Sequence, residues 1–294
     1  MHCFVRAVET GSFSAVAREL GIGQPNVSRH IASLEKELGV GLLHRSTRQL
    51  ALTPEGQRYY PQAREAIDAI AQAESEARGQ HNPRGLLRVA CPTTLASEVI
   101  LDAAPGFLAR FPDIELEFRL SDGYVDLVAE GVDIAVRGGV LKDSALRARR
   151  IGTSERIYVA STAYLQQHGE PREPGELARH QCILYTLLAG GSGNWPFLQG
   201  DVPVSGRVRL DNLEAIRRAM LAGMGIAYLP SWMVAEQLRS GRIKSLLNDY
   251  RGPPAPLNAV YAAARLLPQR ASVFIDFLIG LFARTPGLDG KALV

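Results

Sequence analysis

The hydrophobic pattern near the start of the chain consists of two helical periodicities separated by a short turn. Apolar residues recur at helical spacing from Phe13 to Leu20, and again at intervals of four, three and four residues from Val27 to Leu38. The segment Gly21–Gly23 interrupts them, because glycine disfavours a continuous helix. Two helices around such a turn predict a helix-turn-helix unit, and its second helix has the size to enter the major groove of DNA.

Capping signals place the ends of these helices. Ser12 is a predicted N-cap of the first helix, and Gly39 is a predicted C′ residue of the second. Further along, Thr53, Pro54 and Glu55 open another helix, since threonine caps, proline fits the first helical position and glutamate complements the dipole.

Two short apolar segments within residues 42–52 flank a basic, hydroxyl-rich tip, which is typical of a β-wing. In this tip Arg45 and Arg48 can reach phosphates, while Ser46 and Thr47 offer hydroxyl donors. The alternative is an ordinary hairpin with solvated arginines. Its position directly after a helix-turn-helix favours the wing.

The helix that opens at Thr53 carries a seam for packing against another helix. Positions separated by three and four residues form this seam: Tyr60, Ala63, Ile67, Ile70, Glu74 and Ala77. Pro61 is expected to bend the first turns. We expect the helix to end by Gly79, with residues 81–85 as a hinge.

From Leu86 onward, strand-like runs alternate with helical runs. The strand-like runs cover residues 86–91, 114–120, 134–137, 208–210, 226–230 and 257–261. The helical runs cover residues 97–110, 124–130, 212–222, 232–240 and 269–282. Such alternation predicts parallel sheets with helices on both faces. A segment of this length suits two α/β lobes with a cleft between them.

Composition permits several functions without selecting one. A chain of 294 residues favours two domains and a connector, and 46% hydrophobic with 21% charged residues argues against disorder. The net charge of +3 is too small to indicate nucleic-acid binding by itself. The first 60 residues carry seven basic and five acidic side chains, an excess of two.

The sequence contains no motif for a metal, a cofactor or catalysis. Cys3, Cys91 and Cys182 form no CxxC pair, which predicts idle thiols in a reducing cytosol. The six histidines are scattered, and the motifs of zinc proteases, serine hydrolases and nucleotide-binding loops are absent. No apolar run is long enough to span a membrane, and the first residues do not form a signal peptide. These features predict a cytoplasmic protein that is not an enzyme and has no metal or cofactor.

More than twenty N-terminal positions match the signature of a known family in register. Among them are Phe4, Gly11, Ser12, Phe13, Gln24, Pro25, Leu34, Glu35, Arg45, Thr47, Arg48, Leu52 and Thr53. Segments 132–137, 143–146, 222–227 and 272–278 are similar to the effector domain of the same family. The chain therefore resembles the LysR-type transcriptional regulators, in particular their CrgA-like branch, over essentially its whole length.

The resemblance implies a fold and a set of domains. The fold is an all-α winged helix-turn-helix domain plus a long linker helix, joined to an α/β two-lobed effector domain like the type II periplasmic binding proteins. The expected domains are the winged helix-turn-helix at 1–58, the linker and dimerisation helix at 54–82, and the effector domain at 83–294. Its lobes are expected near residues 86–162 plus 260–294 and near 163–259.

The resemblance also implies partners. They are a double-stranded DNA operator, a small-molecule effector, and further copies of the chain that form a homodimer through the linker helix and then a homotetramer. RNA polymerase is a candidate partner.

Three features depart from the family pattern. The family begins several residues before the equivalent of Phe4, so a shortened first helix is expected. Gly23 stands where a serine or threonine usually caps the recognition helix, which removes a capping hydroxyl. Asn26 replaces a small residue on the groove-facing turn, where it either contacts a base or is solvated.

The candidate DNA-reading residues lie at the start of the second helix of the motif. Gln24 can read adenine with two hydrogen bonds, and Arg29 can read guanine or pair with phosphate. Pro25 can contact a thymine methyl group, while Asn26 and Ser28 are polar neighbours around the buried Val27 face. For each residue alone, simple surface solvation is the alternative.

The candidate effector-binding residues follow from the rule that ligands of α/β domains bind at the carboxyl ends of strands, near helix N-termini. Residues in such positions are Thr93, Thr94, Ser121 and Arg137 in the first lobe, and Tyr185, Gly223 and Gly225 in the second. Arg137 would favour a small organic anion. The alternative for Arg137 is a salt bridge to a neighbouring acid.

Two other classes of protein would explain part of the sequence. A solute-binding or enzymatic α/β protein accounts for residues 86–294 and leaves the N-terminal motif incidental. Deletion of residues 1–58 separates the hypotheses, because a regulator then loses DNA binding and keeps ligand binding. An enzyme or a binding protein should keep its activity.

Overall fold

The computed structural model describes residues 1–44, 50–77, 83–127, 129–139, 146–188, 191, 193–252, 254–263 and 267–290. The chain divides into two compact units. The helical unit comprises residues 1–82 with the short segments 128–131 and 265–269, and the α/β unit comprises the remainder. Each is described by itself below.

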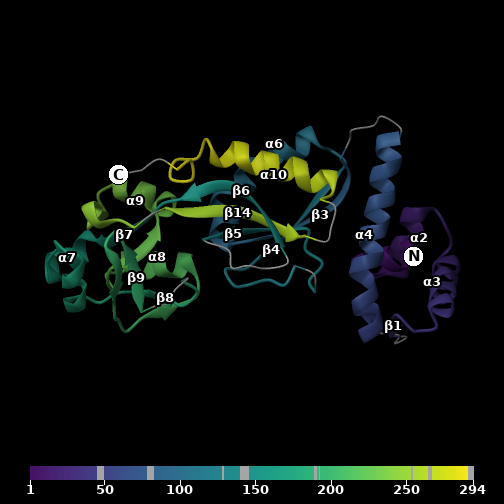
Figure 1. Cartoon of the computed structure of the whole chain (residues 1–294), viewed down its shortest axis with the longest axis horizontal. Helices are drawn as coiled ribbons and strands as arrows, with labels where there is room; N and C mark the ends of the chain where they lie inside the picture. Colours follow the sequence, from purple (N-terminus) through teal and green to yellow (C-terminus); the bar gives the residue numbers. More distant parts are fainter. Residues whose placement is uncertain are drawn as a thin grey trace. The chain divides into compact units, whose positions relative to one another are not determined.

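The helical unit is a winged helix-turn-helix followed by a long helix (Figure 1). Its helices are α1 (His2–Thr10), α2 (Phe13–Leu20), α3 (Gln24–Leu38) and α4 (Pro54–Ala77). The strands β1 (Leu43–His44) and β2 (Ala51–Leu52) pair antiparallel and form the base of the wing. The tip of the wing, residues 45–49, lies outside the described residues, as do residues 78–82, which include the predicted hinge and the predicted end of α4 at Gly79.

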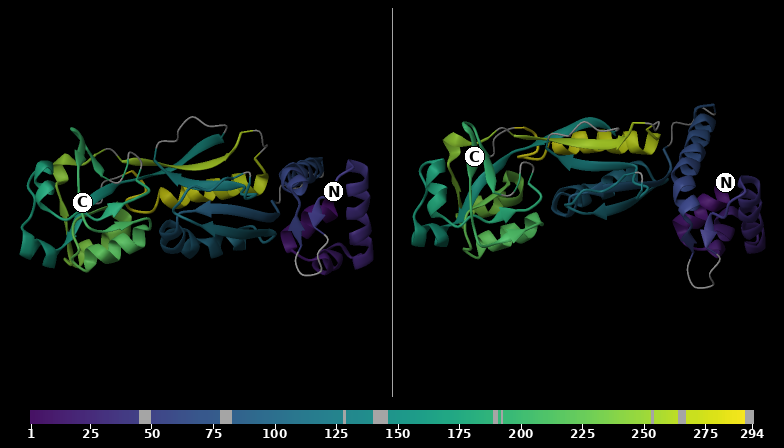
Figure 2. Two further views of the ribbon diagram at one scale, coloured as in Figure 1. Left: turned by 90° about the horizontal axis from the view of Figure 1, so that it is seen from below. Right: turned by 60° about the horizontal axis from the view of Figure 1, so that its bottom comes forward.

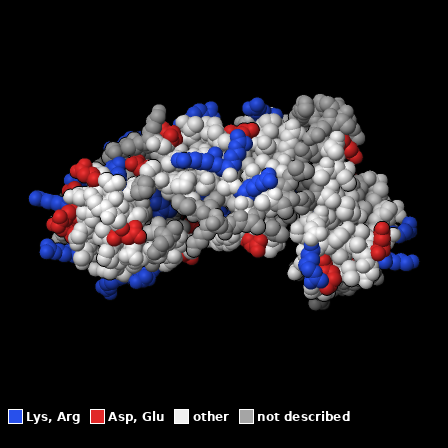
Figure 3. All heavy atoms as spheres, viewed as in Figure 1, with Lys and Arg blue, Asp and Glu red and all other residues white. Residues whose placement is uncertain are grey.

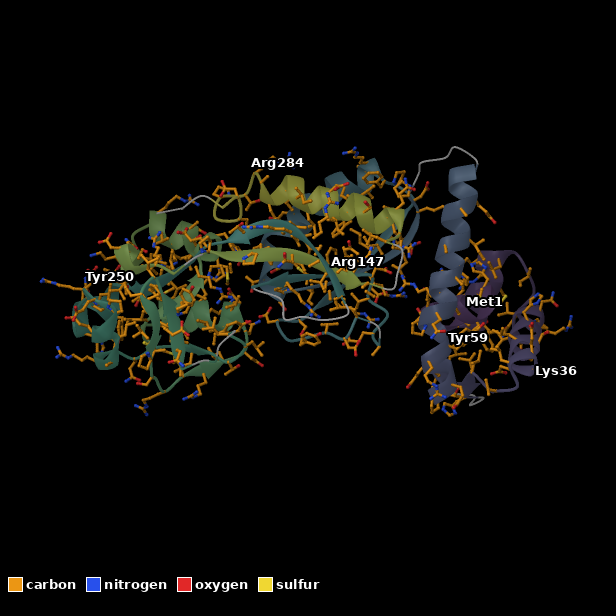
Figure 4. All side chains as sticks on the ribbon, in the orientation of Figure 1. Met1, Lys36, Tyr59, Arg147, Tyr250 and Arg284 are labelled. Atoms are coloured by element: carbon orange, nitrogen blue, oxygen red, sulfur yellow. The ribbon has the colours of Figure 1, made fainter. Side chains whose placement is uncertain are left out.

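The core of the helical unit is formed where α1, α2, α3 and the start of the wing meet. Phe4, Val16, Val27 and Leu42 are fully buried in one apolar cluster. Tyr59 of α4 packs its ring 5.7 Å from that of Phe4, which fastens α4 to α1 (Figure 4). The periodicities read from the sequence are therefore the buried faces of real helices.

The predicted caps of this unit are confirmed. The side chain of Ser12 accepts a hydrogen bond from Ala15 N, and Gly39 ends α3 in the left-handed conformation at φ 71°. The hydroxyl of Thr53 accepts from Gly56 N at 2.9 Å. Gly56 is required for a different reason, because a Cβ atom there would lie 2.1 Å from the backbone oxygen of Leu42.

The α/β unit has two lobes, each with its own sheet. Lobe I is built from residues 83–154 and 255–290, around a five-stranded sheet of order β4-β3-β5-β14-β6. The strands are β3 (Gly85–Cys91), β4 (Ile114–Leu120), β5 (Ile134–Gly138), β6 (Leu146–Ser154) and β14 (Ala255–Ala262). β3 is parallel to β4 and β5, whereas β14 runs antiparallel to β5 and β6.

Helices cover one face of the lobe I sheet. After β3 the chain forms α5 (Thr93–Leu95), a π-helical turn (Ala96–Ile100) and α6 (Leu101–Arg110), and the last helix is α10 (Gln269–Phe282). α6 and α10 lie side by side (Figures 1 and 2). Phe107 of α6 meets Phe274 of α10 with ring centroids 5.1 Å apart, and Phe274 in turn contacts Phe118 of β4.

The opposite face of this sheet corrects the sequence prediction. Residues 124–130 were expected to form a helix, but the described residues there form turns that bury Val125 and Leu127 against Ala90, Ala135 and Val260. A short turn segment can cover the sheet here because the residues of the sheet beneath it are small. Lobe I is therefore helix-covered on one face, not on both.

Lobe II, residues 155–254, is organised around the antiparallel sheet β12-β7-β13. Its strands and helices in chain order are β7 (Arg156–Ser161), α7 (Thr162–His168), η2 (Pro174–Arg179), β8 (Leu184–Tyr185), β9 (Asn194–Phe197), β10 (Gly200–Pro203), β11 (Arg209–Leu210), α8 (Leu213–Leu221), β12 (Ala227–Pro230), η3 (Ser231–Val234), α9 (Ala235–Arg239), β13 (Ile243–Leu246) and η4 (Asn248–Tyr250). α8 packs on one face, through Ile216 and Met220. Aromatic residues such as Trp195 fill the other.

The sheets correct both the expected strand direction and the expected lobe boundaries. The central pairs of lobe II are antiparallel, so only part of the prediction of parallel sheets holds. β7 belongs to the sheet of lobe II and β14 to that of lobe I. The chain therefore passes between the lobes near Glu155 and again just before Ala255, rather than at residues 162 and 259. β6 and β13 were missed because arginine, lysine and serine interrupt their hydrophobic positions, whereas the short continuous apolar run of β7 was not assigned to a strand.

Candidate functional site

The first candidate site is the exposed face at the start of α3. Gln24, Pro25, Asn26, Ser28 and Arg29 are all exposed there. The apolar residues of the same turns, at 27 and 31, are buried in the core. The helix thus presents all five predicted DNA-reading side chains to solvent while its other face anchors it, which is the arrangement that groove insertion needs.

Two weak contacts hold these side chains in the free protein. Arg29 Nη1 donates to Asn26 Oδ1 at 3.2 Å, and the hydroxyl of Ser14 on α2 donates to Gln24 Oε1 at 3.2 Å. Both pairs join exposed groups, so water or a base edge can replace either partner at little cost. Ser14 was not predicted from the sequence, because only the fold brings α2 beside the start of α3.

The wing is fixed to the recognition helix by one carboxylate. Glu35 Oε1 accepts hydrogen bonds from Leu42 N at 2.7 Å and Leu43 N at 3.1 Å, while the hydroxyl of Thr53 donates to Gly41 O at 2.7 Å. These bonds tie both ends of the wing to the body of the unit. The predicted phosphate contacts Arg45, Ser46, Thr47 and Arg48 lie outside the described residues.

Charge on the helical unit is mixed rather than concentrated. Basic and acidic side chains are interspersed on the face seen in Figure 3. Lys36, labelled in Figure 4, is exposed on α3 beside Glu37. On this face, the described basic side chains form no single positive patch, so recognition of an anionic polymer there would depend on individual basic side chains.

The second candidate site lies where the two lobes of the α/β unit meet. Asp122, just after β4 in lobe I, accepts a hydrogen bond from Thr93 N at 2.9 Å. Its other oxygen accepts from Asn212 Nδ2 at 3.0 Å and Leu213 N at 3.4 Å in lobe II. The carboxylate therefore sits at the N-terminus of α8, where the helix dipole favours a negative charge.

A second ionic contact joins the lobes nearby. Arg217 of α8 pairs with Glu98 of lobe I at 2.8 Å, and also with Glu214 at 2.6 Å. Burial raises the pKa of Glu98, although the charge of Arg217 opposes this effect. The lobes are thus held together by Asp122 and by Glu98 on either side of the first turns of α8.

Lobe II contributes a half-buried arginine, Arg156, flanked by tyrosines. The guanidinium carbon of Arg156 lies 5.7 Å from the ring centroids of both Tyr185 and Tyr228. Burial lowers the pKa of Arg156. Burial and the nearby charge of Asp122 raise the pKa of Tyr185 to about 12, so its phenol stays protonated at neutral pH.

The structure brings four of the predicted effector residues to this region. Thr93 binds Asp122 through its backbone, Thr94 follows it, and Ser121 precedes Asp122. Tyr185 is within electrostatic reach of Asp122. The hydroxyl oxygen of Thr94 is buried and has no hydrogen-bond partner.

The other predicted effector residues are placed differently. Arg137 donates to Val125 O at 2.6 Å, and its guanidinium carbon lies 4.1 Å from the ring centroid of Tyr124; no described carboxylate forms a salt bridge with it. Gly223 and Gly225 follow the C-terminal end of α8, whereas Asp122 binds its N-terminal end. Sequence reasoning missed Asp122, Asn212 and Arg156, whose proximity depends on the lobe arrangement.

Reactive and metal-binding groups are not prominent. The three cysteines are free and buried, and burial raises the pKa of the Cys182 thiol to about 12. Among the described residues, histidine, cysteine and acidic side chains form no cluster that could hold a metal ion. Within the same part of the chain, no helix is both long and apolar enough to cross a membrane.

Comparison with known proteins matches both units. The family profile "Bacterial regulatory helix-turn-helix protein, lysR family" matches residues 1–57, and "LysR substrate binding domain" matches residues 80–283. The HTH-type transcriptional regulator CrgA of Neisseria meningitidis serogroup C is 38% identical over 281 residues, which cover 94% of each chain. The HTH-type transcriptional activator AaeR of Escherichia coli K12 is 32% identical over 96% of this chain and 93% of its own.

A solved structure is similar to this chain over both units. The structure of CrgA from Neisseria meningitidis is similar with a TM-score of 0.62 and 37% identity, covering 95% of this chain and 96% of that one. Both the N-terminal motif and the α/β unit are therefore parts of one architecture. The chain belongs to the LysR family of bacterial helix-turn-helix transcriptional regulators.

Proposed function

We propose that this regulator reads its operator with the exposed start of α3 and with the tip of its wing. Gln24, Asn26 and Arg29 would contact base edges, with Pro25 against a thymine methyl and Ser28 on the backbone. Arg45, Ser46, Thr47 and Arg48 of the wing would contact phosphates. The observation that carries this proposal is the single exposed polar face of α3, whose opposite face is anchored in the core.

Selection from random double-stranded DNA tests this proposal. The full chain should enrich one sequence, and its binding should weaken as salt rises, since phosphate contacts release counterions. Replacing Gln24 with alanine should relax the preference at one base position. Enrichment of no sequence, or an unchanged preference in every variant of the α3 face, would contradict the proposal.

The α/β unit would bind a small organic anion between its lobes. Thr93, Thr94, Ser121 and Tyr185 support this site because they gather around Asp122, and the unpartnered hydroxyl of Thr94 can donate to a ligand. Arg137, Gly223 and Gly225 remain proposed contacts that require a larger site. A ligand that prefers one arrangement of the lobes would shift the population of DNA-bound shapes.

The chain would act as a homodimer through α4 and as a homotetramer through further contacts. It would bind operators in the cytoplasm, with RNA polymerase as a partner. On the predicted seam, Ala63 is buried within the helical unit, whereas Ile70 is 55% exposed and suits contact with a second copy. Native mass spectrometry of Ile70→Glu should show fewer dimers than wild type. Leu108→Glu, at an exposed position of α6, is the control. Equal dimer fractions in both variants would contradict this assignment.

A further inference from the structure

Arg156 is the first residue of β7, where the chain enters lobe II. Its atom Nη1 is buried and has no hydrogen-bond partner. Its guanidinium group instead lies over the rings of Tyr185 and Tyr228. Among the described residues, no carboxylate forms an ion pair with it.

Three other arginines of the same unit that are buried or half-buried, Arg88, Arg217 and Arg251, are paired with acids, whereas Arg137 donates to a backbone oxygen. Arg88 pairs with Glu117 at 2.9 Å, Arg251 with Glu155 at 3.0 Å, and Arg217 with Glu98 at 2.8 Å. An arginine keeps its proton even when burial lowers its pKa, because the ordinary value is so high. Arg156 therefore holds a positive charge in an apolar setting without the counter-charge that such burial requires.

The other anion-binding feature of the site is already filled. The N-terminus of α8 holds the carboxylate of Asp122, which accepts from Asn212 and Leu213. A ligand anion would have to displace Asp122 there, whereas Nη1 of Arg156 has no acceptor to displace. The negative charge of Asp122 also acts on Tyr185, the ring beneath Arg156. It would repel a doubly charged ligand such as a phosphate more strongly than a singly charged one.

The buried hydroxyl of Ser231, next to the strand partner of Arg156, can complete the recognition of an anion, and Thr94 in lobe I carries a second unpartnered hydroxyl. Ser231 follows β12, whose residue Pro230 pairs with Arg156, and its backbone N–H donates to Glu155 O. The hydroxyl oxygens of Ser231 and Thr94 are both buried and without hydrogen-bond partners. A carboxylate offers acceptors to a guanidinium and to hydroxyls at the same time.

We propose that Arg156 binds the single carboxylate group of a small organic effector, with the faces of Tyr185 and Tyr228 as flanking walls. This inference rests on the proposed function, in which a small molecule binds between the lobes. It assigns the anion to Arg156 rather than to Arg137, and it selects monocarboxylates over phosphates and sulfates.

Thermal melting of the full chain with three probes tests the ligand class. Benzoate is a flat monocarboxylate, benzamide has its shape without the charge, and sulfate is an inorganic dianion. At a hundredfold excess over its Kd, benzoate should raise the Tm by about 5 °C or more, while benzamide and sulfate should leave it nearly unchanged. An equal response to all three probes, or no response to benzoate, would overturn the proposal.

Variants then test the assigned residue. Arg156→Gln should abolish the response to benzoate, and Arg156→Lys should keep part of it, since lysine retains the charge without the planar fork. Arg218→Gln is the matched control, because Arg218 is a largely exposed arginine of α8. A full benzoate response in Arg156→Gln would overturn the assignment. A loss of the benzoate response only in Arg137→Gln would also overturn it, because the ligand would then bind at another residue.

Two further measurements separate ligand binding from a structural role and from DNA binding. Without ligand, Arg156→Met should melt no lower than wild type by more than about 2 °C, because it removes an unpaired and partly buried charge. A large fall in Tm would show that Arg156 is structural and would overturn the proposal. Arg156→Gln should still bind operator DNA without ligand. If the wild-type protein also fails to bind operator DNA, that result contradicts the proposed function instead.

Discussion

Arg29 on the recognition helix and Arg156 between the lobes are the same side chain in opposite settings. Arg29 is exposed, hydrogen-bonded only to Asn26, and surrounded by other exposed polar groups. Arg156 is packed between two tyrosine rings, with a buried nitrogen that has no partner. Exposed polar groups are hydrated in the free protein, so the polar face of α3 costs little stability before DNA binds. A buried polar group without a partner remains unfavourable until a ligand supplies a hydrogen bond or an opposite charge.

This difference predicts how each region responds to substitution. Changes on the face of α3 should alter DNA binding and leave stability untouched, since those side chains support nothing else. Changes between the lobes should alter ligand binding, and those that remove a contact between the lobes, as at Asp122, should lower stability as well.

The largest effect is expected for Arg29→Ala in DNA binding. Loss of a base or phosphate contact should weaken operator affinity by about 10- to 100-fold, which corresponds to about 1–3 kcal/mol. Fluorescence anisotropy on an operator duplex measures this, with Arg218→Ala as the control. The Tm should not move. Wild-type affinity in Arg29→Ala would remove this residue from the interface.

Asp122→Asn should destabilise the contact between the lobes. An amide keeps one acceptor oxygen but turns its other end into a donor that faces the donors of Asn212 and Leu213. We expect a loss of about 1–2 kcal/mol in the free energy of unfolding by urea. Amide exchange at the start of α8 should become faster. Asp249→Asn, at an exposed position, is the control, and equal behaviour of the two variants would show that Asp122 does not hold the lobes.

Glu35→Ala tests whether the wing needs its anchor. The substitution leaves Leu42 N and Leu43 N without their acceptor, which should cost about 1 kcal/mol in stability and lower operator affinity several-fold. Glu37→Ala on the same helix is the matched control, because Glu37 is exposed. Glu35 belongs to the helical unit, yet its substitution should lower both stability and DNA binding, because its hydrogen bonds to Leu42 N and Leu43 N are partly buried. An affinity loss without any loss of stability would contradict the anchoring role.

The smallest effect is a pH dependence in lobe II. His180 Nδ1 and the hydroxyl of Tyr164 are hydrogen-bonded at 3.3 Å, and the same hydroxyl accepts from Gln181 N. Burial, followed by the nearby His168, lowers the pKa of His180, while Glu176 opposes this. The neutral ring is therefore favoured in the folded state.

The sign of the pH effect follows from that lowered pKa. The contribution of His180 to stability is present above its unfolded pKa of about 6.5 and is lost as the pH falls through the lower folded value. His180→Gln should lose less Tm than wild type between pH 7 and pH 5. Parallel curves for the two proteins would contradict this.

The sequence was sufficient for the helical unit because its signals are local. The caps at Ser12, Gly39 and Thr53 and the exposed residues around Val27 all follow from spacing within one or two turns. The fold of the α/β unit was predicted in outline, and four candidate effector residues, Thr93, Thr94, Ser121 and Tyr185, lie near Asp122. Local signals also explain the errors, since a buried turn such as 124–130 resembles a helix when only its apolar residues are counted.

The remainder of the effector site could not be predicted because it depends on distant segments. Asp122 and Leu213 are 91 positions apart in the chain, yet their contact joins the lobes. The isolation of Arg156 is likewise a property of its surroundings, and no spacing in the sequence encodes it. Arg137 was the more obvious candidate, as it ends a predicted strand, but its neighbours Val125 and Tyr124 already engage it.

The order of strands in lobe I has a consequence for how the protein is made. β14 lies between β5 and β6 in the sheet, so β6 pairs only with β14. β14 is synthesised after all of lobe II. Until then β6, with its exposed Arg147, Arg149 and Arg150, has no partner strand in that sheet. Lobe II and the helical unit can fold on the ribosome while lobe I waits for the end of the chain. The arginines of β6 would keep that waiting edge from pairing with another chain, because charged side chains discourage aggregation of an open strand.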